Sequence, residues 1–168
     1  MARRTVSKTR RAASPAALSW VPIDPDYSNR DGYDAAFLGT RIAVPQPDDE
    51  HMLAADLLSP LKYQHFSVVM HRKRKIAAFT AANIDGAKKY ERSGREPDTW
   101  HEDPRAPGVQ TMQAFYRKPF QRGHLVMRTD PAWGGKRVAE RAEADTFHWT
   151  NCSPQHQRLN NPWWLSVE

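Results

Sequence analysis

Two β patterns joined by a highly charged turn constrain the fold of this chain most strongly. In residues 63–71 (YQHFSVVMH), large apolar side chains stand at every second position from residue 66 to residue 70, which is the two-residue period of a half-buried strand. The side chains expected to share the buried face are Phe66, Val68 and Met70. Residues 76–84 (IAAFTAANI) have the composition of a partner strand, and the segment 71–75 (HRKRK) connects the two. The sequence therefore predicts an antiparallel hairpin with a basic tip, which either contacts a nucleic-acid backbone or is simply solvated.

The segments after the hairpin predict shorter elements. Residues 87–120 are polar, rich in charge and proline, and without a sustained period, so we expect a long functional surface loop. A short strand is expected at 123–127, and the Ala, Glu and Arg content of 136–144 predicts an exposed helix. Residues 146–150 return to a β pattern. An antiparallel sheet with flanking helices is an α+β fold.

The last residues predict a helix. Asn161 stands directly before Pro162, which suits an N-cap followed by proline at the first helical position, and the helix is expected to run toward residue 168. Trp149 and Trp163 are expected in the core.

Charge and size favour a soluble domain with polyanionic partners. The 168 residues include 25 Lys and Arg against 19 acids, giving a formal charge of +6 and an isoelectric point near 9.7. Five of the basic residues precede the first acid, Asp24, so part of the excess belongs to a tail. We expect a disordered basic arm at 1–20 and one domain at 21–168.

The chain carries no sign of export or of a membrane span. No apolar run approaches the ~20 residues that cross a bilayer, and the amino terminus lacks a secretory apolar segment. The single cysteine, Cys152, excludes an internal disulfide and is expected to be a small buried side chain. These features exclude a membrane partner and favour a cytoplasmic location.

Two polar clusters carry the chemistry. The first is QRGHL at 121–125, followed by DPAWG at 130–134, and the second is TNCSPQ at 150–155, followed by Leu159-Asn160. Their order and spacing resemble the DNA/RNA non-specific endonucleases, the ββα-metal (His-Me finger) nucleases, whose motif is Asp-Arg-Gly-His. The resemblance covers roughly residues 33–168.

The resemblance implies a metal-dependent, sequence-non-specific endonuclease that hydrolyses phosphodiester bonds of DNA and RNA to 5′-phosphate products. It implies His124 as general base, Asn160 as the ligand of Mg²⁺ (or Mn²⁺), and Glu168 as a carboxylate that orients water on the metal. Arg122 and Asn151 would complete the catalytic site. Arg95 is a further candidate for binding the substrate phosphate.

The residue types suit that chemistry. Imidazole exchanges a proton near neutral pH, and one amide oxygen can anchor Mg²⁺, which otherwise keeps water and phosphate oxygens. Arg122 lies two positions before His124, so on a strand both point to the same side, where a guanidinium can clamp phosphate. Asn160 and Glu168 are eight residues apart, about 12 Å along a helix, and so cannot both bind one ion directly.

Two departures from the family leave competing hypotheses open. Gln121 stands where the motif has Asp, and family domains continue beyond the helix that carries the carboxylate, so we expect a fold incomplete at its carboxyl end. The chain could instead be a basic nucleic-acid-binding protein with an impaired site, or a fragment that needs a partner chain to complete its sheet. A homodimer or an inhibitor protein is a further possible partner.

Overall fold

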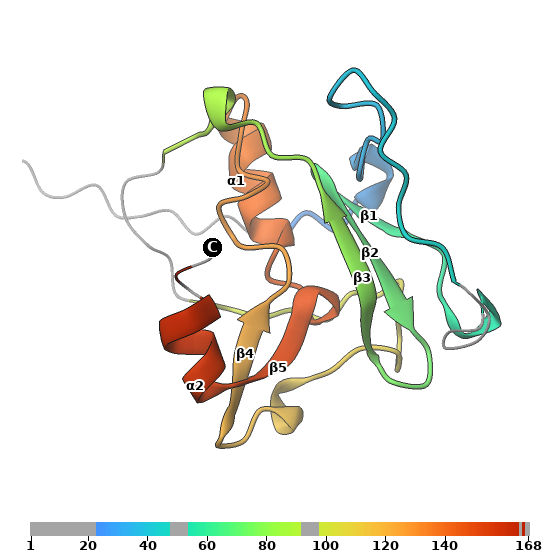
Figure 1. Cartoon of the computed structure of the whole chain (residues 1–168), viewed down its shortest axis with the longest axis vertical. Coiled ribbons are helices and arrows are strands. Elements are labelled where there is room, and N and C mark those ends of the chain that lie inside the picture. Colours follow the sequence, from blue (N-terminus) through green and yellow to red (C-terminus); the bar gives the residue numbers. More distant parts are fainter. Residues whose placement is uncertain (1–22, 48–53, 92–97, 165, 167–168) are drawn as a thin grey trace, which may run out of the picture.

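The computed structural model describes residues 23–47, 54–91, 98–164 and 166 (Figure 1). The expected basic arm at 1–20 lies outside the described residues, as do Arg95 and Glu168. Within the described part of the chain, no helix is long and apolar enough to cross a membrane. The mixture of antiparallel sheets with a few helices agrees with the expected α+β class.

A three-stranded antiparallel sheet forms the first half of the fold. Its strands are β1 (Leu61–Tyr63), β2 (Phe66–His71) and β3 (Ile76–Ala82), in that order across the sheet. The β2–β3 pairing confirms the hairpin and its charged turn, with a register irregularity between Val69 and Met70.

One correction concerns the first of the expected strands. Residues 63–71 do not form one strand, because the chain reverses between Tyr63 and Phe66 and these two residues pair. His65 in this turn has a φ of 67°, which a non-glycine residue seldom adopts. The His65 ring stacks on Trp133 with 3.5 Å between the ring centroids, and its Nδ1 lies 2.8 Å from the carbonyl oxygen of Pro131. These tertiary contacts stabilise a turn that local sequence does not reveal.

The core lies against the first sheet. Phe66, Val68 and Met70 are completely buried, as the alternation predicts, and Tyr63 stacks on Phe66 with 4.8 Å between ring centroids. Each large apolar side chain buried in this way stabilises the fold by about 1.5–3 kcal/mol. The other buried members of the cluster are Leu61, Ala106 and Val126.

The second half of the fold is a two-stranded antiparallel sheet, with one helix between its two strands in sequence and a second helix after them. Strand β4 (Phe120–His124) pairs with β5 (Cys152–His156), and α1 (Lys136–Asp145) lies between them in sequence. Directly after β5 the chain enters α2 (Gln157–Leu159) and a π-helical continuation, η6 (Asn160–Trp164). In Figure 1, α2 lies beside β4, while α1 lies above both strands.

Two expected strands differ from the structure here. The strand expected at 123–127 begins and ends three residues earlier, and 146–150 is not a strand. Those residues lead into a buried 3-10 turn (Trp149–Asn151) that precedes β5. All five residues 146–150 are buried. Their composition suits burial in either kind of element, so it does not distinguish a strand from a turn.

The final helix also begins earlier than expected. His156, not Asn161, is the N-cap, since its Nδ1 accepts a hydrogen bond from the Arg158 backbone at 3.2 Å. Trp149 is buried as expected, whereas Trp163 is 70% exposed and was wrongly placed in the core. Within η6 the π-helical geometry accommodates Pro162, which has no N–H to donate to a regular helical ladder.

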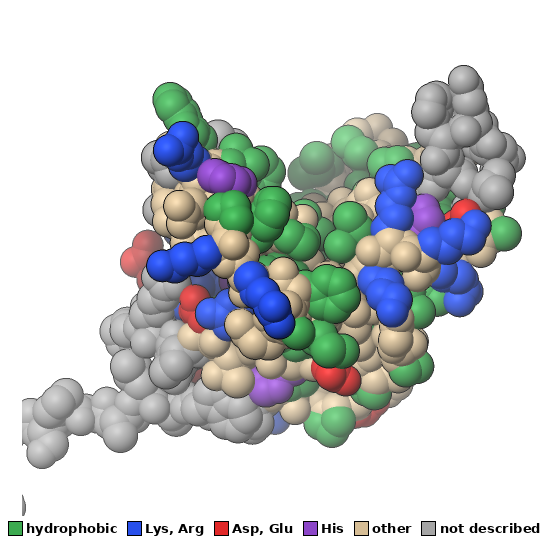
Figure 2. All heavy atoms as spheres, turned by 90° about the horizontal axis from the view of Figure 1, so that it is seen from below, with side chains coloured by type: hydrophobic (Ala, Val, Ile, Leu, Met, Phe, Trp, Pro, Cys, Tyr) green, Lys and Arg blue, Asp and Glu red, His purple; other side chains and the backbone are tan. Residues whose placement is uncertain are grey.

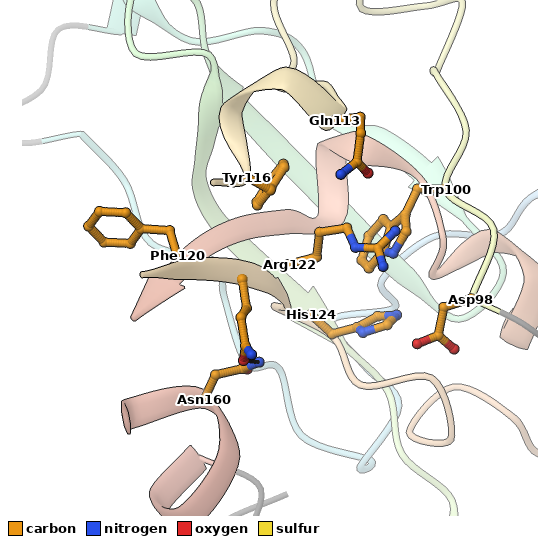
Figure 3. Close-up of a pocket in the computed structure, with 9 residues that line it drawn as sticks. Asp98, Trp100, Gln113, Tyr116, Phe120, Arg122, His124 and Asn160 are labelled. Carbon is orange, nitrogen blue, oxygen red and sulfur yellow. Dashed lines mark hydrogen bonds between the residues drawn. The ribbon is translucent and has the colours of Figure 1, made fainter. Parts of the chain in front are cut away.

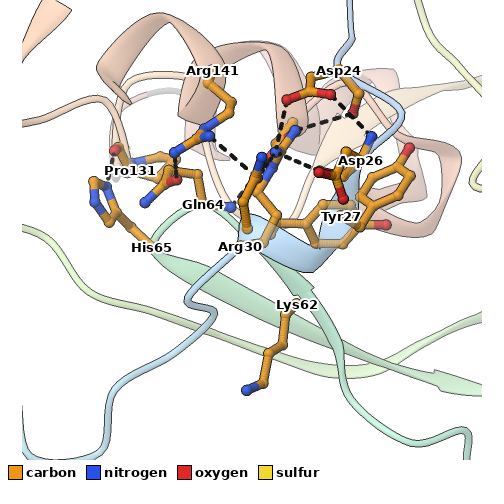
Figure 4. A network of polar contacts seen from close by, with 12 residues as sticks. Asp24, Asp26, Tyr27, Arg30, Lys62, Gln64, His65, Pro131 and Arg141 are labelled. Atoms are coloured by element: carbon orange, nitrogen blue, oxygen red, sulfur yellow. Dashed lines mark hydrogen bonds and ion pairs between the residues drawn. The ribbon is translucent and has the colours of Figure 1, made fainter. Parts of the chain in front are cut away.

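A buried ion pair ties the amino-terminal segment to α1 (Figure 4). Arg30, 4% exposed, donates to Asp145 at 2.6 and 3.1 Å. The same carboxylate accepts the backbone N–H of Gln64 at 2.9 Å. One buried acid thus joins the β1–β2 turn, the helix and residues 24–30.

A second buried acid organises the loop that leads toward β4. Asp103 is fully buried and accepts hydrogen bonds from the Tyr63 hydroxyl and, at 2.7 Å, from the Arg105 guanidinium. Burial alone would raise the pKa of Asp103, but the hydrogen bonds from Arg105 and Tyr63 outweigh it and hold that pKa below its usual value.

Candidate active site

A cavity of about 330 Å³ lies between β4, the helix after β5 and the loop before β4 (Figure 3). Its lining combines two basic side chains, one acid, three amides and three aromatic rings. They are Arg122, His124, Asp98, Gln113, Gln121, Asn160, Trp100, Tyr116 and Phe120.

Strand β4 supplies the two basic groups. Arg122 and His124 are two residues apart, so the pleat of the strand sends both to the same side, as expected from the sequence. Arg122 is exposed and available to a ligand. The His124 ring is held by aromatic neighbours: its centroid lies 4.6 Å from that of Trp100 and 4.9 Å from that of Phe147.

Asn160 reaches the same cavity from the helical segment after β5. Its Nδ2 donates a hydrogen bond to Oε1 of Gln121 at 3.1 Å. This hydrogen bond uses one of the two N–H donors of the amide, and the amide oxygen Oδ1 is the atom of Asn160 able to accept a cation. Gln121 therefore supplies an acceptor where the family motif has a carboxylate. The structure brings together His124, Arg122 and Asn160, which sequence reasoning placed in one site.

Asn151 lies behind the cavity and not in its lining. It is fully buried, its Oδ1 accepts from the Val126 backbone at 2.9 Å, and its Nδ2 donates to the carbonyl oxygens of Val126 and Thr146, each at 2.9 Å. Its side chain thus holds the chain just after His124. Asn151 therefore lies outside the lining of the cavity, and its expected place in the catalytic group stays a prediction.

The glycine between Arg122 and His124 is required by packing. A Cβ at Gly123 would lie 2.2 Å from Cδ and 2.6 Å from Cγ of Gln155, far inside van der Waals contact. Gln155 is itself buried, at 8% exposure. Any larger residue at 123 must displace Gln155 or move β4, and with β4 the two basic groups.

Sequence reasoning missed most of the far wall of the cavity. Asp98, Gln113 and Tyr116 come from the loop at 87–120, which has no period from which to infer side-chain direction. Phe120 was missed because the strand was expected to begin after it. The strand period could have revealed Phe120: in a strand that begins at residue 120, Phe120 and Arg122 point to the same side.

The donor set fits a hard cation held weakly by the protein. Among the residues that the structure describes, no three His, Cys, Asp or Glu side chains gather to hold a metal ion. Asn160 and the exposed Arg122 line the same cavity, and an amide oxygen together with a guanidinium for the phosphate suits Mg²⁺ shared with a phosphate and water. Asp98 also lines the cavity, with an oxygen 3.6 Å from the Arg128 guanidinium.

The charged side chains on the face at the bottom of Figure 1 are mostly basic. In Figure 2, which shows that face, Lys and Arg side chains are more abundant than Asp and Glu. The exposed residues 72–75 of the β2–β3 turn are all basic, although Lys73 pairs with Asp56 at 2.9 Å. Arg117 and Lys118, just before β4, are exposed as well. Such a surface favours a polyanionic ligand.

Together these features define a small mixed α/β protein with antiparallel sheets and a polar cavity suited to phosphate. In a comparison with known protein families, the family model for DNA/RNA non-specific endonuclease matches residues 51–168. The chain belongs to this family. It is also 42% identical over 154 residues to a protein from Sinorhizobium fredii named "Uncharacterized protein y4fB". That match covers 80% of this chain and 23% of the relative, so the chain spans about a quarter of the relative's length.

Proposed function

We propose that this protein is a metal-dependent endonuclease that hydrolyses phosphodiester bonds of DNA and RNA without regard to sequence. The observation that carries the proposal is the convergence of His124, Arg122 and Asn160 on one cavity, although they come from a strand and from a helix 36 residues further along the chain. An arrangement with His124 and Asn160 on opposite sides of the molecule would have excluded it.

Each side chain has a distinct task. An imidazole nitrogen of His124 takes a proton from the attacking water, whose oxygen bonds to phosphorus as the bond to the 3′ oxygen breaks. The product is a 5′-phosphate and a free 3′-hydroxyl. Arg122 clamps non-bridging phosphate oxygens through two parallel N–H donors. Because contacts to phosphate carry no base information, cleavage is indifferent to sequence.

Mg²⁺, or Mn²⁺ in its place, would be held by Asn160 and would stabilise the negative charge that develops on the phosphate and the leaving oxygen. Gln121 orients the Asn160 amide through the hydrogen bond described above. Its presence in place of Asp therefore keeps the acceptor and loses only the charge. We assign Arg95 to a further phosphate contact and Glu168 to orienting water near the metal, two roles that remain predictions.

The fold supports this assignment at the level of topology. Two antiparallel strands, β4 and β5, are followed directly by the helical segment that carries Asn160. His124 ends the first strand. We propose that this unit is the ββα-metal, or His-Me finger, element of the family.

The test incubates purified protein with plasmid DNA and with RNA, in Mg²⁺ or in EDTA. The wild type is expected to cut both substrates only with Mg²⁺, and His124→Ala to lose at least ~10²-fold in rate, the usual size for removal of a general base. Arg122→Ala is compared with Arg137→Ala, which removes an exposed arginine of helix α1 outside the cavity. Only the first of these is expected to impair cleavage.

Two results would contradict the proposal. Equal cutting by wild type and His124→Ala, with equal thermal unfolding, would place the chemistry elsewhere. Salt-dependent binding of DNA without any cleavage in Mg²⁺ or Mn²⁺ would instead favour a nucleic-acid-binding protein with an inactive site.

A further inference from the structure

Three aromatic side chains form one wall of the cavity that holds the proposed catalytic groups. Trp100 and Tyr116 both stack on buried Trp149, with centroids 5.4 Å away in each case, so their rings are fixed. Phe120 differs from them, because 47% of it is exposed and its described ring contact is an edge contact with His156 at 6.1 Å. An apolar ring on the rim of a polar site remains available to a ligand.

The strand places Phe120 at a defined position relative to the phosphate-binding arginine. Phe120, Arg122 and His124 alternate along β4, so their side chains leave the same side of the strand. Phe120 and Arg122 are therefore about 7 Å apart along the backbone, a spacing close to one nucleotide of an extended single strand. Figure 3 shows Phe120 at the end of the cavity away from His124 and Asp98.

We propose that Phe120 is a nucleobase subsite: it stacks on an unpaired base next to the phosphate held by Arg122 and makes the enzyme prefer single-stranded to double-stranded nucleic acid. Base faces are open to an aromatic ring in single strands and covered by neighbouring pairs in a duplex. A phenyl ring has no polar atom with which to distinguish one base from another, so stacking keeps the site indifferent to sequence. This inference rests on the proposed function, since it requires phosphate at Arg122.

The chain offers a matched control for this subsite. Phe115 is similarly exposed, at 52%, and lies in a 3-10 turn (Gln113–Phe115) of the loop that precedes β4, but it does not line the cavity. A general effect of removing an exposed aromatic ring would appear in Phe115→Ala as well as in Phe120→Ala. A stacking subsite affects only Phe120→Ala, and Phe120→Trp should preserve it.

The experiment measures binding in EDTA, where cleavage does not interfere, by fluorescence anisotropy of labelled oligothymidine, oligouridine and a DNA duplex of equal length. Phe120→Ala is expected to weaken binding of the single strands about 5- to 100-fold, the range for loss of one stacked base, with less than a twofold change for the duplex. Phe120→Trp should bind like wild type, and so should Phe115→Ala. The two single strands show whether DNA and RNA share the subsite.

Equal weakening of duplex and single strand by Phe120→Ala, or equal effects of Phe120→Ala and Phe115→Ala, would overturn the inference. Because no catalysis is needed, its failure can be told apart from failure of the proposed nuclease function. Loss of cleavage with the expected binding pattern would contradict only the latter.

Discussion

Replacing Gly123 by alanine should unfold the protein more easily and misplace the active site. The added Cβ would approach Cδ, Oε1 and Cγ of Gln155 to 2.2, 2.4 and 2.6 Å. Optimal contacts between carbon atoms are about 3.5–4.0 Å, so the overlap exceeds about 1 Å. Gln155 is 8% exposed and has little room in which to turn aside. Overpacking of this kind costs about 1–3 kcal/mol, which in a chain of this size lowers the melting temperature by about 2–10 °C.

Gln155→Ala provides the complementary change, because it deletes all three atoms that the new methyl group would meet. Oε1 of Gln155 accepts no hydrogen bond from the described residues, so its removal leaves no donor unpaired among them. The assay is urea unfolding of wild type, Gly123→Ala, Gln155→Ala and the double variant. We expect the double variant to be at least about 1 kcal/mol more stable than the sum of the two single effects predicts. Cleavage of plasmid should fall in Gly123→Ala and recover at least in part in the double variant.

Additive effects of the two substitutions would refute the reasoning. They would mean that the cost of alanine at 123 does not arise from contact with Gln155. Normal stability of Gly123→Ala alone would lead to the same conclusion.

Three further predictions follow from single contacts. Gln121→Ala should raise the Mg²⁺ concentration for half-maximal cleavage about 10- to 100-fold, since it removes the group that orients the Asn160 amide, whereas Gln121→Glu should not. Asp103→Asn should lower the free energy of unfolding by about 2–3 kcal/mol at neutral pH, because a fully buried carboxylate is lost from Arg105. The pKa of Asp103 in the folded protein is depressed, so its stabilising effect is complete above the unfolded value of about 3.9 and is lost as the pH falls through the folded pKa. Urea unfolding between pH 2 and 7 should therefore show the free energies of unfolding of wild type and Asp103→Asn converging at the acid end. Burial raises the pKa of Cys152 to about 12, so a thiol reagent at pH 8 should modify it only after unfolding, and rapid modification of the native protein would contradict its burial.

The elements that local sequence predicted are those with a regular period or an unambiguous composition. The β2–β3 hairpin was recognisable because Phe66, Val68 and Met70 alternate toward the core and a charged turn follows them. Helix α1 was recognisable from its Ala, Glu and Arg content. The boundaries of β4 were misplaced because its pairing with the distant strand β5 sets them, and the start of the last helix was misplaced because His156 caps it.

For the site, the sequence by itself determined which chemical groups are available and that Arg122 and His124 leave one side of a strand. Only the tertiary structure decided that Asn160 lines the same cavity, that its amide donates to Gln121, and that the buried Asn151 side chain bonds to the backbone of Val126. It also decided which members of the long loop reach the cavity. The physical reason is that residue type and period specify side-chain chemistry and local direction, whereas proximity between distant segments follows from packing of the whole chain.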